Sequence, residues 1–90
     1  MGGENFGTGR GNLDRVGDLN AAMTAEFEAL MQRKHGSRDA YFRESGVDKR
    51  NFYKVLSRNP QIGWLQKHLD WFGVDLGTFF DEVARRQREQ

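Results

Sequence analysis

The chain has 90 residues and no cysteine, which fits one small domain and excludes a disulfide framework and a thiolate metal site. A core this small leaves little room for a catalytic cleft between domains, and the net charge of +1 does not by itself indicate a class of partner. No apolar run reaches the roughly 18 residues of a membrane span, and the first residues lack the apolar stretch of a secretory signal, so we expect no membrane association and a soluble cytoplasmic protein.

The amino-terminal segment is rich in glycine. Residues 1–17 contain six glycines and few large apolar side chains. Because glycine is entropically costly to order, we expect a flexible arm over residues 1–17. The domain itself is expected to cover residues 18–84, followed by a polar tail over residues 85–90.

The first predicted helix runs from about Leu19 to Lys34. Its apolar residues recur at spacings of three and four, which places them on one face, and Gly36 ends it. The residues of this stripe are Leu19, Met23, Phe27, Leu30 and Met31. Asp18 is its expected N-cap, and the stripe is expected to belong to the core.

Two short helices are predicted next, joined by a tight turn. The first covers Arg38 to Glu44, with Ser37 as its N-cap and with Tyr41 and Phe42 on its buried side. Gly46 ends it, and Val47 fills the turn. The second begins at Asp48 as N-cap and extends to about Ser57. Its inner face is formed by Phe52, Val55 and Leu56.

The last two predicted helices cover about Gln61 to Phe72 and a segment that begins at the N-cap Asp75. Gly73 separates them. Their apolar stripes are Ile62, Leu65, Leu69 and Phe72, and then Leu76, Phe79, Phe80 and Val83. Since no segment alternates apolar and polar residues as a strand would, we predict an all-α fold of five short helices.

The segment from Ser37 to Ser57 has the pattern of a helix-turn-helix, in which glycine permits the sharp reversal between two helices. Basic residues also gather there: six of them stand against three acidic ones over residues 38–58, which gives this segment a charge of +3. The inner apolar face of residues 48–57 leaves the outer face free. A basic, outward-facing helix is typical of a polyanion-binding surface.

Here the sequence resembles the lambda-repressor-like (XRE/Cro-like) helix-turn-helix family. The resemblance continues through Phe72-Gly73-Val74, Leu76 and Phe79-Phe80, which match the closing helices of that family, and it covers about Leu19 to Phe80. The run NFYKVLSRNP is also similar to the antidote proteins of addiction modules. The resemblance implies a transcriptional regulator, repressor-like, that places residues 48–57 in the major groove of double-stranded DNA.

The expected DNA contacts follow from position on this motif. Lys49, Arg50 and Asn51 open the second helix and are the expected base readers. Tyr53 and Lys54 lie one turn further on. The remaining basic residues, Arg38, Arg43 and Arg58, are expected to bind phosphates.

A two-fold dimer is expected, because one such helix contacts only a few base pairs. Trp64 and Trp71 share one side of the fourth helix, which indicates either a protein interface or a wide core face. The predicted dimer interface is Trp64, Trp71, Phe79, Phe80 and Val83.

No catalytic or metal site is predicted. His35 and His68 have no companion ligand at metal spacing, and no cofactor is expected. The acidic pairs Glu26/Glu28 and Asp81/Glu82 are expected to lie on solvated faces, since no nucleophile accompanies them. Three functions stay open: a DNA-binding regulator, an antitoxin that binds both DNA and a toxin partner, and a helical adaptor that does not bind DNA.

Overall fold

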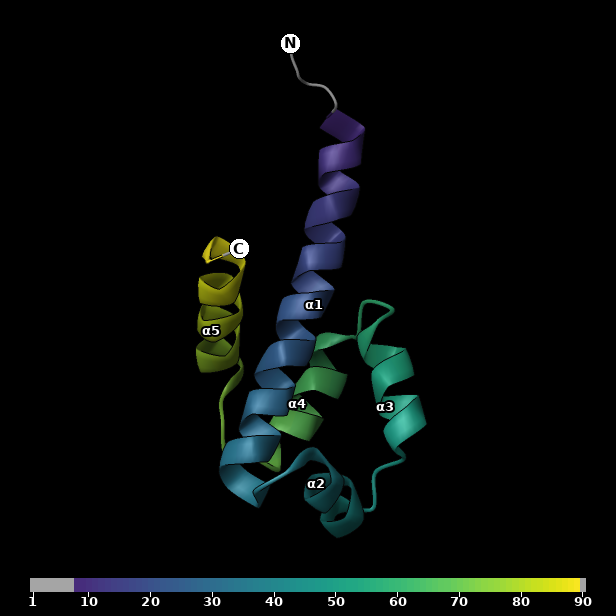
Figure 1. Cartoon of the computed structure of the whole chain (residues 1–90), viewed down its shortest axis with the longest axis vertical. Coiled ribbons are helices and arrows are strands. Elements are labelled where there is room, and N and C mark those ends of the chain that lie inside the picture. Colours follow the sequence, from purple (N-terminus) through teal and green to yellow (C-terminus); the bar gives the residue numbers. More distant parts are fainter. Residues whose placement is uncertain (1–7, 90) are drawn as a thin grey trace.

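The computed structural model describes the backbone of residues 8–89 and the side chains of residues 19–89. This part of the chain contains five α-helices and no strand, so the all-α prediction is confirmed (Figure 1). The helices are α1 (Thr8–His35), α2 (Arg38–Ser45), α3 (Lys49–Leu56), α4 (Ile62–Asp70) and α5 (Leu76–Arg88).

Helix α1 is longer than expected. It begins at Thr8 instead of Leu19, so residues 8–17 of the predicted arm belong to it, and the rest of that arm lies outside the described residues. Adding residues to an existing helix costs far less than nucleating one, which explains how glycine-containing sequence extends α1. The start of α1 projects beyond the other helices in Figure 1. The predicted polar tail is helical as far as Arg88.

The helix ends follow local chemistry. The Ser37 hydroxyl accepts a hydrogen bond from the Ala40 amide at 3.0 Å, and the Asp75 carboxylate accepts one from Thr78 at 2.7 Å. Hydrogen bonds from Thr78 lower the pKa of Asp75. Gly46 ends α2 with a left-handed φ of 74°. Asp48 occupies the N-cap position of α3 as predicted, but its side chain makes no capping hydrogen bond there.

The core is built around the ring of Phe27 on α1. Phe52 of α3 meets it edge-on with ring centroids 5.3 Å apart, Phe79 of α5 lies at 4.9 Å, and Trp64 and Phe72 lie at 6.4 and 6.3 Å. One aromatic side chain therefore contacts rings from three other helices and from the segment after α4. The remaining large buried residues include Met23, Leu30, Met31, Tyr41, Leu56, Leu65, Leu69 and Val83.

Aromatic side chains also join α2 to α3. Phe42 lies 5.4 Å from Phe52, and Tyr41 lies 6.3 Å from it, centroid to centroid. Val47, in the turn between the two helices, packs against the core as expected. The turn comprises three residues, and the two helix axes run in different directions in Figure 1. The inner face of α3 is thus fixed to α2 and α1.

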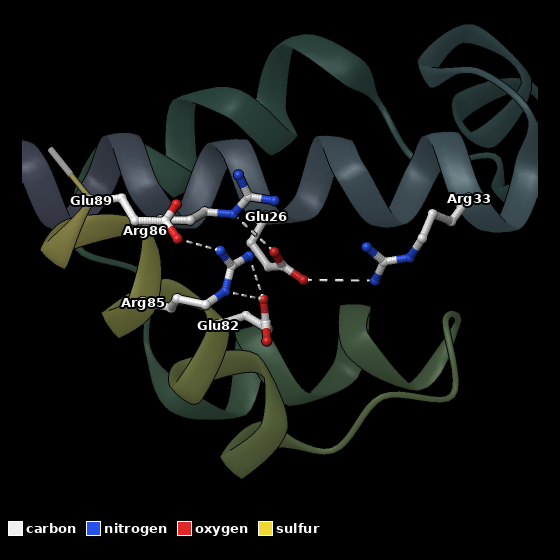
Figure 2. Close-up of polar contacts among 6 residues, drawn as sticks. All are labelled: Glu26, Arg33, Glu82, Arg85, Arg86 and Glu89. Carbon is white, nitrogen blue, oxygen red and sulfur yellow. Dashed lines mark hydrogen bonds and ion pairs between the residues drawn. The ribbon is translucent and has the colours of Figure 1, made fainter.

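Glu26 of α1 is buried where α5 packs against α1, contrary to the expectation of a solvated face. The Arg86 Nε donates a hydrogen bond to its Oε1 at 3.0 Å, and an Arg33 nitrogen lies 3.8 Å from its Oε2 (Figure 2). Sequence spacing could not reveal this, because the covering helix comes from the other end of the chain. The bond between Arg86 and Glu26 therefore joins α5 to α1.

His68 on α4 is buried between rings, with its imidazole 4.4 Å from the Trp64 ring and 5.2 Å from Phe52. Burial, with a smaller contribution from the nearby Lys67 charge, lowers the pKa of His68 below 6.5. The folded state therefore disfavours the protonated ring. The unfolded chain binds that proton more tightly.

We expect the protein to lose stability in mild acid because of His68. The contribution of the neutral His68 ring to the free energy of unfolding is fully present above the unfolded pKa of about 6.5. This contribution is lost as the pH falls below that value toward the lower folded pKa. Urea unfolding of the wild type between about pH 5 and pH 7.5 should show a falling midpoint on the acid side, and His68→Gln should flatten this slope. Equal slopes in the two proteins would refute the assignment.

Candidate nucleic-acid interface

Helix α3 has one buried and one exposed side. Phe52 and Leu56 face the core, whereas Arg50, Asn51 and Lys54 are exposed. At 100° per residue, Arg50 and Lys54 lie one turn apart on the same face, with Asn51 beside them and Phe52 and Leu56 on the opposite side. The two cations and the amide therefore form a single outward face.

The charges on this face differ in how they are paired. The Lys49 Nζ lies 3.6 Å from an Asp39 carboxylate oxygen on α2, and both groups are exposed to solvent. Such surface pairs are weak, so Lys49 keeps most of its positive field. Within residues 19–89, Arg50 and Lys54 take part in no ion pair. They are the cations of α3 most available to an anionic partner.

Tyr53 is turned toward α1. Its hydroxyl donates a hydrogen bond to Glu28 Oε2 at 2.9 Å, and Arg38 Nη1 donates to the same oxygen at 3.3 Å. The Arg38 guanidinium carbon lies 5.8 Å from the centroid of the Tyr53 ring. Burial and the Glu28 carboxylate raise the pKa of Tyr53 to about 12, so its phenol stays protonated. Of the predicted contact residues, Tyr53 and Arg38 are therefore both bonded to α1 through Glu28.

The other predicted phosphate ligands flank α3. Arg43 is exposed in the last turn of α2, and Arg58 is exposed just after α3, where its amide donates to the Val55 carbonyl at 3.0 Å. The end of α3 is tied to α1, because Asn20 Nδ2 donates to the Ser57 carbonyl oxygen at 3.3 Å. The predicted basic residues thus lie along α2, α3 and the turn that follows.

Sequence reasoning missed Glu28 as a member of this cluster. A solvated position is the expectation for Glu28, and its side chain is 39% exposed. Its carboxylate nevertheless bonds to Tyr53 and Arg38. Glu28 and Tyr53 are 25 residues apart, and no local pattern connects them. The available signal was indirect: an acid on α1 and a tyrosine beside the inner face of α3.

The predicted dimer residues do not share one surface. Phe79 and Val83 are only 0% and 1% exposed and belong to the core of a single chain, so they have no surface to offer to a second copy. Trp64 and Phe80 are partly buried against that core. Trp71 is exposed. Apolar spacing on α5 marked the side that faces α1, and not a free side.

Metal binding and membrane crossing were also considered for the described residues. No group of three or more His, Cys, Asp or Glu residues in this part of the chain could hold a metal ion. His35 instead hydrogen-bonds to Glu44, with its Nδ1 2.7 Å from the carboxylate oxygen. None of the described helices has the length and apolar character required to cross a bilayer.

Comparisons with protein-family models, with curated proteins and with solved structures found no match to this chain.

Proposed function

We propose that the chain is a sequence-specific DNA-binding protein, in which α2 and α3 are a helix-turn-helix and α3 lies in the major groove. The observation that carries this proposal is the outward face of α3, where Arg50, Asn51 and Lys54 are exposed while Phe52 and Leu56 are buried behind them. A B-form major groove admits one α-helix, whose side chains then meet the base edges.

The chemistry of this face suits base readout. Arginine pairs with the O6 and N7 acceptors of guanine, and asparagine pairs with the N7 and N6 of adenine. Arg50 and Asn51 lie in the first turn of α3, the part of such a helix that meets base edges. Lys54 lies one turn on, and Arg43 and Arg58 flank the helix, as phosphate ligands would.

A repressor-like regulator acting as a homodimer is the biological role that we propose, in line with the family resemblance. Two copies would read two half-sites about 34 Å apart. Trp71 is the remaining exposed aromatic of the predicted interface in the described part of the chain. A toxin or another regulator as a protein partner is kept as the alternative, for which the resemblance of residues 51–60 to antidote proteins is the support.

Selection of bound sequences from a random pool of duplex DNA tests the function directly. We expect a short enriched motif, arranged as an inverted repeat if two copies bind. Affinity for the selected duplex should fall steeply as salt is raised, because each phosphate contact releases counterions. The absence of both enrichment and salt-dependent binding would favour the adaptor function instead.

Arg50→Ala is expected to weaken binding to the selected duplex by about 1–3 kcal/mol and to relax the preference at one base position. The reason is the loss of a bidentate contact with a base edge. Competition binding with duplexes substituted at each position measures both effects.

Arg88→Ala is the matched control, because it removes the same charge from the exposed end of α5. Figure 1 shows that this end lies away from α2 and α3. We expect Arg88→Ala to leave the base preference intact. Unchanged affinity and preference in Arg50→Ala would remove Arg50 from the base-reading residues.

A further inference from the structure

We propose that Glu28 is a positioning residue for α3: its carboxylate, by holding Tyr53 and Arg38 together, fixes the orientation in which α3 presents Arg50 and Lys54. Tyr53 accordingly acts through Glu28 and does not contact bases. This inference rests on the proposed function, although its structural half can be tested without DNA.

Tyr53 and Arg38 share one oxygen of Glu28. Glu28 Oε2 accepts from the Tyr53 hydroxyl at 2.9 Å and from Arg38 Nη1 at 3.3 Å. One atom on α1 therefore contacts the middle of α3 and the first residue of α2. No other carboxylate among the described side chains bonds to both of these helices.

Apolar packing alone does not fix the rotation of α3 about its own axis. Helix α3 has eight residues; Phe52 and Leu56 anchor it through one apolar ridge, and the bond from Asn20 to the Ser57 carbonyl holds its C-terminal end. Apolar burial is non-directional, whereas a hydrogen bond has preferred angles. Tyr53 lies beside that ridge, so its bond to Glu28 opposes rotation of α3 about the ridge. Groups that read a ligand need placement within about 0.5 Å.

The negative charge of Glu28 is compensated where it lies. Glu28 is partly exposed at the edge of a basic face, where a bare carboxylate would repel DNA phosphates. The hydrogen bonds that Glu28 accepts from Tyr53 and Arg38 offset this unfavourable charge within the domain. A guanidinium has five N–H groups, so the bond from Arg38 to Glu28 leaves others free for a phosphate. The same carboxylate thus orients Arg38 at the rim of α3.

A positioning role and a purely electrostatic role of Glu28 predict opposite effects of Glu28→Ala on DNA binding. If Glu28 were only a negative charge near DNA, its removal would tighten binding to every sequence. If Glu28 positions α3, the ratio of affinities for the selected duplex and for an unrelated duplex of equal length should fall by at least about fivefold, the effect of one weakened base contact. Glu28→Gln keeps an acceptor for Tyr53 and should restore most of that ratio.

A measurement on the free protein reports the contact itself. The chain has two tyrosines, so tyrosine labelled with ¹³C gives two sets of ring signals at neutral pH, and Tyr53→Phe assigns them. The Tyr53 Cζ signal should move in Glu28→Ala and return toward the wild-type position in Glu28→Gln. The Tyr41 signal should stay in place, which verifies that the core is intact.

Glu44→Ala is the matched control, since it removes an exposed carboxylate from α2 that bonds to His35 and not to Tyr53. It should change neither the Tyr53 signal nor the affinity ratio. An unmoved Tyr53 signal in Glu28→Ala would overturn the proposal whatever the protein binds. A moved signal with an unchanged ratio would overturn the positioning role and leave DNA binding standing, whereas a wild type that binds no DNA would overturn both.

Discussion

Phe27→Ala is expected to lower the free energy of unfolding by about 3–5 kcal/mol, the cost of emptying a buried aromatic site. The Phe27 side chain is 0% exposed, and its ring contacts Phe52, Trp64 and Phe79, which lie on three different helices. Native domains have roughly 5–15 kcal/mol of stability in total, so this loss would remove a large share of it. Urea denaturation followed by circular dichroism measures it.

Phe80→Ala serves as the control for this prediction. Phe80 is partly buried on α5, and its ring meets Phe79 at 5.4 Å at the margin of the core. We expect a clearly smaller loss of stability, because solvent can enter part of the vacated space. Equal losses in the two variants would contradict the central place of Phe27 in the core.

The helices could be predicted where their signals are local. Gly46 and Gly73, which the sequence indicated as helix ends, have a left-handed φ, and the Asp75 side chain caps α5 as predicted. The core positions Met23 and Phe27 followed from spacings of three and four. The start of α1 could not be predicted, because glycine content lowers helix propensity but does not stop a helix that has already formed.

The outward face of α3 was also predictable. Once Phe52 and Leu56 are assigned to the core, the helical period places Arg50 and Lys54 on the other side. The contacts of Glu28 with Tyr53 and of Glu26 with Arg86 were not predictable, since they join residues 25 and 60 positions apart. Both depend on which helices pack against α1, and an acidic residue on a long helix does not indicate its partner.

The second large effect is expected for Arg86→Ala. Its guanidinium bonds to Glu26 at 3.0 Å, and the Glu26 side chain is only 3% exposed (Figure 2). Removing one partner leaves a carboxylate without adequate compensation in the interior, and the remaining arginine, Arg33, lies 3.8 Å away and is largely in solvent. We expect a loss of about 3 kcal/mol in urea denaturation at neutral pH, at the lower end of the range for such pairs because Arg86 is partly exposed.

Arg85→Ala, one residue away on α5, is the matched control. Arg85 forms shorter ion pairs than Arg86, at 2.7 Å to both Glu82 and Glu89, but all three side chains are solvent-exposed. We expect little change in the unfolding midpoint, because the burial of the partners, and not the length of the ion pair, decides the cost.

The double replacement Glu26→Leu with Arg86→Met should recover most of the stability lost in Arg86→Ala, since apolar side chains of similar size need no charge compensation. If Arg86→Ala costs no more than Arg85→Ala, the Glu26 carboxylate is solvated in the folded protein and α5 does not cover that side of α1.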